Sequence, residues 1–270
     1  MNSSDVLVFS PRFNTTAVAI GAAAHERGIR TESLSDWRVP EYLRGHQSAH
    51  LYAGPLFADA ISDALGLALL EPPADWLSSL PVEVTGREIV TTTIAEAREL
   101  RRPAFIKPPN DKSFPARVYT DGSRLPGPDA VDDDLRVLVS DVVTFRREYR
   151  LFVLDGRVHS GSLYFREGEL CLEALTGSRD DAAVSGFATD FLSAFAHTLP
   201  SAVVVDIGMM ALEGGGERPC VIEANMAWAS GHYACDAGRV LDVVLRAAFN
   251  RSLLTEQDAR FARASTTVTG

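Results

Sequence analysis

The chain has 270 residues, of which 46% are hydrophobic and 23% are charged, so it is long enough to bury a sizeable core. Its formal net charge of −10 argues against a nucleic-acid partner held by a broadly basic surface, although a local group of cations can still bind an anion. Three cysteines without metal-ligand spacing, no signal-peptide pattern and no membrane-length apolar run predict a cytoplasmic protein with reduced thiols and no membrane partner.

Residues 1–80 alternate strand and helix patterns, which predicts a small parallel sheet covered by helices. The segment after the first strand, 10–14, lacks the glycines of a dinucleotide-binding loop and argues against a Rossmann cofactor site. The predicted strands are 6–9, 31–34 and 50–53, with a further apolar run at 67–70, and the predicted helices are 16–27, which has Gly28 as its C-cap, and 55–65, which has a proline near its start.

The rest of the chain divides into a central lobe over 81–139, a C-terminal lobe over 140–255 and a polar, frayed tail over 256–270. The predicted elements are a helix at 93–100, strands at 104–107 and 135–139, strands at 148–154 and 158–165 joined by a turn at 155–156, a helix at 181–199 and an amphipathic stretch at 237–249. The apolar residues of 237–249 are candidates for an interface in a homo-oligomer.

The most informative pattern is a pair of apolar runs, 203–209 and 220–225, that read as the two strands of one hairpin. If Asp206 faces Glu223, the midpoint of the pairing falls between Gly214 and Gly215, where the chain has to reverse.

Asn225 shares a face with Glu223 because side chains alternate along a strand, and the register brings Asp206 to that face. Two opposed carboxylates on buried strands repel each other strongly unless a cation lies between them, and oxygen ligands of this kind suit Mg²⁺. The alternative is one acidic residue on each of two ordinary, half-exposed strands.

Three cations lie within eleven residues of this acidic chain. Lys107 ends a predicted buried strand and is followed by proline, a position typical of a lysine that binds a fixed anion such as phosphate. Lys112 and Arg117 follow on the adjacent loop, which could fold over a polyphosphate although it is not a P-loop. Strand-edge capping for Lys107 and solvated surface charge for Lys112 and Arg117 remain the alternatives.

Glu148 and Arg150 point together from one face of a strand whose other face is apolar. One interpretation is an exposed cross-strand ion pair of little energetic weight. The functional interpretation is a carboxylate that holds ribose hydroxyls beside a guanidinium that binds a phosphoryl or carboxylate oxygen.

The order of these motifs over residues 85–240 resembles the ATP-grasp superfamily, and residues 6–73 resemble its preceding N-terminal domain. Three segments are similar to compact bacterial and phage ATP-grasp proteins of undefined substrate: 105–108, 111–117 and 223–231. The resemblance implies an ATP-grasp fold with a small parallel βαβ domain and two lobes that clamp ATP. The family's glycine-rich lid is replaced here by 110–117, which contains no glycine.

The resemblance also implies residue roles. Lys107 matches the lysine that contacts the α- and β-phosphates of ATP, and Glu148 matches the acid that binds ribose. Residues 139–144 match the hinge between the lobes. In that hinge the Asp141 carboxylate and the backbone of Val142 and Thr144 would meet the adenine edge. The Mg²⁺ ligands would be Asp206, Glu223 and Asn225. Lys112 and Arg117 would supply by side-chain charge what backbone N–H groups supply elsewhere in the family.

The activity implied is that of a ligase in which a small-molecule carboxylate attacks the γ-phosphate of MgATP and an amine then displaces phosphate from the acyl phosphate. Arg150 is the main candidate for stabilising the transferred phosphoryl group, with Lys112 and Arg147 as further catalytic candidates. A kinase that releases a phosphorylated product and a non-catalytic nucleotide-binding module are the alternatives.

Four residues after the metal candidates could line the acceptor pocket, although packing or a satisfied polar contact is the favoured interpretation for each: Trp228, Ser230, His232 and Tyr233. His159 and His197 have no companion at metal-ligand spacing and are predicted to be structural.

Overall fold

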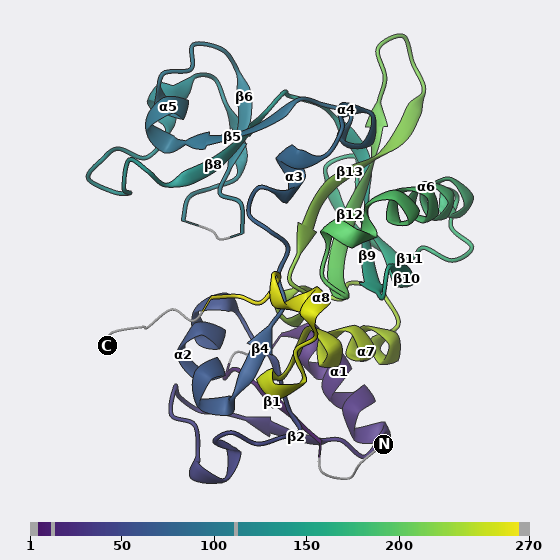
Figure 1. Cartoon of the computed structure of the whole chain (residues 1–270). Coiled ribbons are helices and arrows are strands. Elements are labelled where there is room, and N and C mark those ends of the chain that lie inside the picture. The colour runs from purple at the N-terminus through teal and green to yellow at the C-terminus, as the bar shows by residue number, and fades with distance from the viewer. Residues whose placement is uncertain (1–4, 12–13, 111–112, 265–270) are drawn as a thin grey trace.

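The structure is a computed structural model that describes residues 5–11, 14–110 and 113–264 (Figure 1). It combines one parallel sheet with antiparallel sheets and helices, so the predicted α/β class is confirmed. The strands are β1 Val6–Phe9, β2 Arg30–Ser33, β3 Ala49–Tyr52, β4 Leu67–Leu69, β5 Ile89–Thr93, β6 Ala104–Lys107, β7 Arg117–Tyr119, β8 Arg136–Ser140, β9 Phe145–Leu154, β10 Arg157–Arg166, β11 Glu169–Ala174, β12 Ala202–Ala211, β13 Glu217–Asn225 and β14 Ala248–Asn250. The α-helices are α1 Thr15–Glu26, α2 Pro55–Leu65, α3 Trp76–Ser79, α4 Val82–Thr85, α5 Ile94–Arg98, α6 Asp181–Phe195, α7 Ala237–Ala247 and α8 Glu256–Ala259.

The N-terminal unit is a parallel sheet of order β2-β1-β3, which lies with α1 and α2 at the bottom of Figure 1. Local sequence signals set its helices. The Asn14 side chain accepts a hydrogen bond from the Ala17 N–H at the start of α1, and Pro55 opens α2. Gly28 and Gly66 have positive φ just after the two helices, as helix-ending glycines do.

Two antiparallel sheets lie above this unit in Figure 1. The first has the order β5-β8-β6-β7 and carries α5, and the second has the order β11-β10-β9-β12-β13 and packs against α6. Residues 141–144 are the connection from β8 to β9 and therefore join the two sheets. The predicted turn at 155–156 is confirmed, since Asp155 and Gly156 both have the positive φ that a type I′ hairpin requires.

The C-terminal part of the chain returns to the N-terminal unit, which the sequence analysis does not anticipate. Helix α7 buries its apolar face in the same core as β1, β3 and α1, so that face is not available as an interface between copies. Strand β14 pairs with β4, which therefore stands outside the parallel sheet.

The predicted frayed tail differs from the structure as well. It contains α8, the buried ring of Phe261 and an isolated β-bridge from Ala262 to Leu70. Only residues 265–270 of the tail lie outside the part of the chain that the structure describes.

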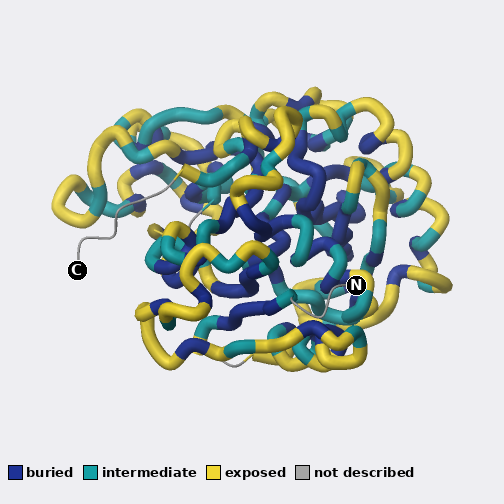
Figure 2. The backbone as a smooth tube through the Cα atoms, turned by 60° about the horizontal axis from the view of Figure 1, so that its bottom comes forward, coloured by how far each residue is buried: buried dark blue, intermediate teal, exposed yellow. Residues whose placement is uncertain are grey.

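Buried backbone is concentrated inside the sheets and exposed backbone at the periphery (Figure 2). The five-stranded sheet has a core on each face. One face packs toward α7 and the N-terminal unit through Phe152 and Val204, and the other packs toward α6 through Leu151 and Val205. Among the described residues, no helix combines the length and apolar character needed to cross a membrane.

Candidate active site

The β12–β13 hairpin brings three predicted metal ligands together. Asp206 lies directly opposite Glu223 in the strand register, as the glycine midpoint predicts. The Asn225 side-chain amide donates to Glu223 Oε1 at 2.9 Å and to Asp206 Oδ2 at 3.3 Å. We call Asp206, Glu223 and Asn225 the carboxylate–amide trio.

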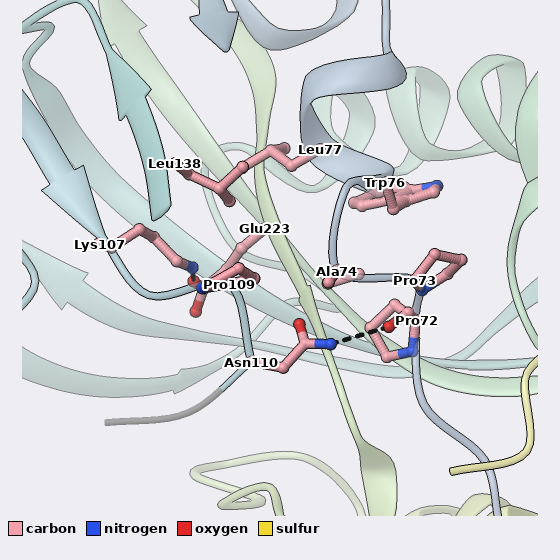
Figure 3. Close-up of a pocket in the computed structure, with 11 residues that line it drawn as sticks. Pro72, Pro73, Ala74, Trp76, Leu77, Lys107, Pro109, Asn110, Leu138 and Glu223 are labelled. Atoms are coloured by element: carbon pink, nitrogen blue, oxygen red, sulfur yellow. Dashed lines mark hydrogen bonds and ion pairs between the residues drawn. The ribbon is translucent and has the colours of Figure 1, made fainter. Parts of the chain in front are cut away.

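Two cations from other strands contact the trio. Arg150 on β9 forks the buried Asp206 carboxylate, with Nε at 2.9 Å from Oδ1 and Nη2 at 2.7 Å from Oδ2. Lys107 at the end of β6 forms an ion pair with Glu223, and Figure 3 shows the two side chains pointing toward each other. The two lobes thus meet at this pair, one lobe contributing the lysine and the other the carboxylate.

The two carboxylates of the trio respond oppositely to this environment. Burial alone would raise the pKa of Glu223, but the Lys107 ammonium and the Asn225 amide outweigh burial and lower the pKa to about 2. Burial raises the pKa of Asp206 above its ordinary value, and the attraction of Arg150 offsets only part of that rise. The site therefore stabilises one negative charge strongly and carries the second at a cost.

Glu148 lies in the electrostatic field of the trio and contacts a pair of aromatic rings. Burial, followed by repulsion from Asp206 and Glu223, raises its pKa, although a hydrogen bond from Tyr164 Oη at 2.6 Å opposes the rise. The Tyr164 ring stacks on Tyr233 with centroids 4.8 Å apart.

The Arg150 guanidinium lies over both of these rings, 5.5 Å from the Tyr164 centroid and 4.9 Å from the Tyr233 centroid. Tyr233 has a φ of 51°, which is unusual for a bulky residue and is typical of functional sites. Tyr164 is not among the candidates that the sequence indicates.

The connection between the two sheets positions three predicted nucleotide contacts. The Asp141 carboxylate accepts from the Glu88 N–H at 3.2 Å and lies 3.5 Å from Arg102. The Thr144 carbonyl accepts from the Ala211 N–H at 2.9 Å, while the Val142 side chain is half exposed. The carbonyl of Thr144 is therefore already used to anchor the connection to β12.

The loop after β6 is only partly described. Lys112 lies outside the described residues. Arg117 is exposed on β7, and its guanidinium lies 4.8 Å from the centroid of Tyr119. The Asn110 side-chain amide donates to the Pro72 carbonyl at 3.0 Å, which ties the start of the loop to the segment before α3 (Figure 3).

A pocket of about 230 Å³ lies between this loop and the trio, with Lys107, Asn110, Trp76 and Glu223 among its lining residues (Figure 3). This is below the roughly 300–1,000 Å³ of usual ligand pockets. A nucleotide would enter only if the loop or the Lys107–Glu223 pair shifted.

Arg147 does not join this site, which corrects its place among the catalytic candidates. Side chains alternate along β9, so Arg147 projects from the face opposite to Arg150. There it is buried in ion pairs with Asp180 and Glu217, and Tyr149 Oη donates to the same Asp180 at 2.6 Å. The position of Arg147 indicates a structural role.

The candidates for an acceptor pocket divide into two kinds. Trp228 is fully buried and donates from Nε1 to the Leu70 carbonyl at 2.8 Å, and Ser230 Oγ donates to the Met226 carbonyl at 2.7 Å. Both are therefore used by the fold. His232 and Tyr233 lie nearer the cations, since the Gly231 carbonyl between Ser230 and His232 accepts from Arg150 at 3.3 Å.

The remaining histidines make structural contacts. His159 Nε2 lies 2.9 Å from Asp242 Oδ2, and the backbone carbonyl of His197 accepts from Arg260. His232 Nδ1 lies 3.0 Å from Thr16 Oγ1, and burial lowers the pKa of its imidazole.

The donor chemistry of the trio fits a hard divalent cation. Two carboxylates and an amide oxygen resemble the small protein share of a Mg²⁺ shell, which substrate phosphates and water usually complete. Among the described residues, no group of three or more His, Cys, Asp or Glu side chains is placed to hold a metal ion, so this trio would depend on its amide and on a substrate.

Two lobes that meet over a carboxylate–amide trio and its cations, beside a small parallel domain, define the class of ATP-grasp proteins. Residues 84–243 match a family model described as an ATP-grasp domain, the second family of its clade. The match spans more than half of the chain, and the protein belongs to this family. The resemblance stated from the sequence motifs is thereby confirmed.

Solved structures support the fold. The ATP-grasp ligase PsnB complexed with minimal precursor is 16% identical, with a TM-score of 0.51 over 90% of this chain and 99% of that one. The D-cycloserine synthetase DcsG is 16% identical, with a TM-score of 0.50 over 89% and 98%. A pyruvate carboxylase from Rhizobium etli is 16% identical, with a TM-score of 0.55 over 94% of this chain but 29% of that one. No curated protein matches the sequence.

Proposed function

We propose that the protein is an ATP- and Mg²⁺-dependent ligase that joins a small-molecule carboxylate to an amine. The carrying observation is that Asp206, Glu223 and Asn225 lie together in contact with Lys107 and Arg150. Membership of the ATP-grasp family supports the use of ATP, and the ligases among the solved structures of similar fold support ligation. Use of ATP also fits the cytoplasmic location predicted from the sequence.

The reaction has two steps whose atoms balance. A substrate carboxylate oxygen attacks the γ-phosphorus of ATP, which forms an acyl phosphate and releases ADP. The amine nitrogen then attacks the acyl carbon, loses a proton and displaces inorganic phosphate. Positioning and charge neutralisation are the main demands of the phosphoryl step, so the cations of the site matter more than a general base.

The residues of the site supply these demands. In this proposal Lys107 binds the α- and β-phosphates, and Arg150 stabilises the transferred phosphoryl group. Lys112 and Arg117 add positive charge from the loop. Glu148 receives the ribose hydroxyls, and the segment Asp141–Thr144 meets the adenine edge.

Asp206, Glu223 and Asn225 would hold the Mg²⁺, which when bound neutralises phosphate charge and polarises the γ-phosphoryl group. Lys107 and Arg150 now neutralise the two carboxylates of the trio. Both cations can therefore turn to phosphate oxygens once another positive charge faces the trio.

The test is ADP release from MgATP with a panel of carboxylates, each with and without amines, and product masses measured in parallel. We expect ADP release that requires both substrates and an amide product. Turnover that needs no amine and leaves a stable phosphorylated product would contradict ligation and indicate a kinase. Binding of ATP without turnover on any substrate would indicate a binding module.

The trio is tested by Glu223→Ala, with Glu173→Ala as the matched control. Glu173 lies on β11 of the same sheet and is exposed beside Arg166. We expect Glu223→Ala to reduce turnover and Mg²⁺-dependent nucleotide binding by at least about 100-fold, since even outer-shell changes at metal sites cost 10–100-fold. The control should retain both, and survival of both in Glu223→Ala would refute the assignment of the trio.

A further inference from the structure

The alignment of the trio depends on an irregularity in β13. From Ile207 toward the turn, Ile207 pairs with Val221 and Gly208 with Cys220. The next pair is Asp206 with Glu223, so Ile222 is an extra residue on β13. One residue on β12 thus corresponds to two on β13, which is the definition of a β-bulge.

The bulge decides which face of the sheet Glu223 occupies. Without it, the register at the turn would place Glu223 opposite Val205, because a shift of one residue moves every side chain to the other face. Val205 belongs to the apolar core that packs against α6. With the bulge, Glu223 lies opposite Asp206, and Asn225 can donate to both carboxylates.

A buried arginine holds the backbone at this bulge. Arg87 follows α4, which contacts β13 (Figure 1). Its Nη1 donates to the Val221 carbonyl at 3.1 Å, and its Nη2 donates to the Ile222 carbonyl at 3.0 Å. Nη1 also donates to the Thr85 carbonyl at 2.9 Å.

The partners of Arg87 are unusual for a buried cation. The residue is 7% exposed, yet in the described part of the chain no carboxylate lies within ion-pair distance of it. Its guanidinium lies over the Phe145 ring, 5.3 Å from the centroid. Three backbone carbonyls and one ring therefore hold a buried charge that a simple packing role would not require.

We propose that Arg87 is a positioning residue for the candidate metal site, since it fixes the Ile222 bulge that puts Glu223 on the same face as Asp206. The proposal rests on the proposed function for the identity of the ion, but the effect of Arg87 on strand register does not. Arg87 acts only through the backbone of β13 and touches no substrate.

The first measurement is Mg²⁺ titration of the binding of a non-hydrolysable ATP analogue to the full chain. We expect Arg87→Met to raise the Mg²⁺ concentration for half-saturation by 10–100-fold, the range typical of outer-shell changes at metal sites. The matched control is Arg246→Met, which removes a partly buried arginine of α7 that pairs with Asp258 outside the trio. The control should lose thermal stability and keep the wild-type Mg²⁺ dependence.

The second measurement separates positioning from general destabilisation. Deleting Ile222 removes the bulge and leaves Glu223 opposite Asp206 in a regular strand, so Arg87 should no longer be needed. We expect Arg87→Met combined with the Ile222 deletion to bind within about threefold of the deletion alone. The proposal is overturned if the combined variant is as impaired as Arg87→Met, fails to fold, or if Arg87→Met alone leaves Mg²⁺ dependence unchanged.

A third readout needs no ligand. In NMR spectra of the ligand-free protein, cross-strand contacts from the Asp206 backbone should reach Glu223 in the wild type and move to Ile222 in Arg87→Met. An unchanged register in Arg87→Met would refute the positioning role whatever the protein catalyses. Wild-type protein that shows the register but no Mg²⁺-dependent nucleotide binding would refute the proposed function instead.

Discussion

At the scale of single residues, Glu223 shows how the site handles charge. The pKa of this carboxyl is about 2 in the folded protein and 4.5 in its ordinary state, because Lys107 and Asn225 outweigh the effect of burial. A lowered folded-state pKa gives stability that is present above pH 4.5 and is lost as the pH falls toward 2. Asp206 has a raised pKa and contributes in the opposite direction.

We expect the wild type to lose about 1–3 kcal/mol more unfolding free energy than Glu223→Gln between pH 5 and pH 2.5, because the amide does not titrate. Urea denaturation at the two pH values measures this difference. Glu173→Gln serves as the control, since its exposed carboxylate should leave the wild-type pH profile intact. Parallel profiles for wild type and Glu223→Gln would show that the Lys107 pair adds no net stability.

The sequence predicts the partners of the trio better than the partners of its neighbours. The glycines of the turn place Asp206 opposite Glu223, and the structure has that pairing. Tyr164 could not be found in the same way. The turn at 155–156 fixes the register at the start of β10, but two irregularities then shift it before Tyr164 reaches Glu148. A bulge has no reliable signal in a single sequence, and each one changes the face of every later side chain.

At the scale of elements, β9 carries two buried arginines with different tasks on its two faces. Arg150 meets the trio, whereas Arg147 is enclosed by Asp180 and Glu217 on the α6 side. The sequence shows the alternation of β9 but not Asp180, which the fold brings in from the start of α6. The long-range partner, rather than the strand pattern, separates a structural arginine from a catalytic candidate.

We expect Arg147→Met to destabilise the protein by about 3–5 kcal/mol, because it leaves two carboxylates without their buried partner. Nucleotide affinity should not change in protein that remains folded. Urea denaturation and calorimetric titration with MgATP measure the two effects. Arg166→Met, which breaks an exposed pair with Glu173, should cost no more than about 1 kcal/mol. A large loss of nucleotide affinity in Arg147→Met would return this residue to the active site.

At the scale of the whole molecule, the C-terminal segment closes the N-terminal unit. The βαβ rhythm of residues 1–80 predicts the parallel sheet, but its core is completed by α7 and β14, which lie far along the chain. Hydrophobic periodicity predicts that α7 buries one face and does not say against what. The polar composition after Ser252 likewise hides the contacts of α8, because those contacts are made by charged residues that the fold buries in pairs.

Asp258 on α8 joins three parts of the molecule and provides the test of this closure. It is fully buried, accepts from Ser201 N at 2.9 Å and Ser201 Oγ at 2.7 Å, and pairs with Arg246 of α7 at 2.5 Å. Asp258→Ala leaves the Arg246 charge and the Ser201 N–H without this partner, so we expect a loss of about 3–5 kcal/mol in urea denaturation. Glu256→Ala, an exposed position on the same helix, should stay within about 0.5 kcal/mol of wild type. If both variants match the wild type, the segment after Ser252 contributes no more than the polar tail that its composition predicts.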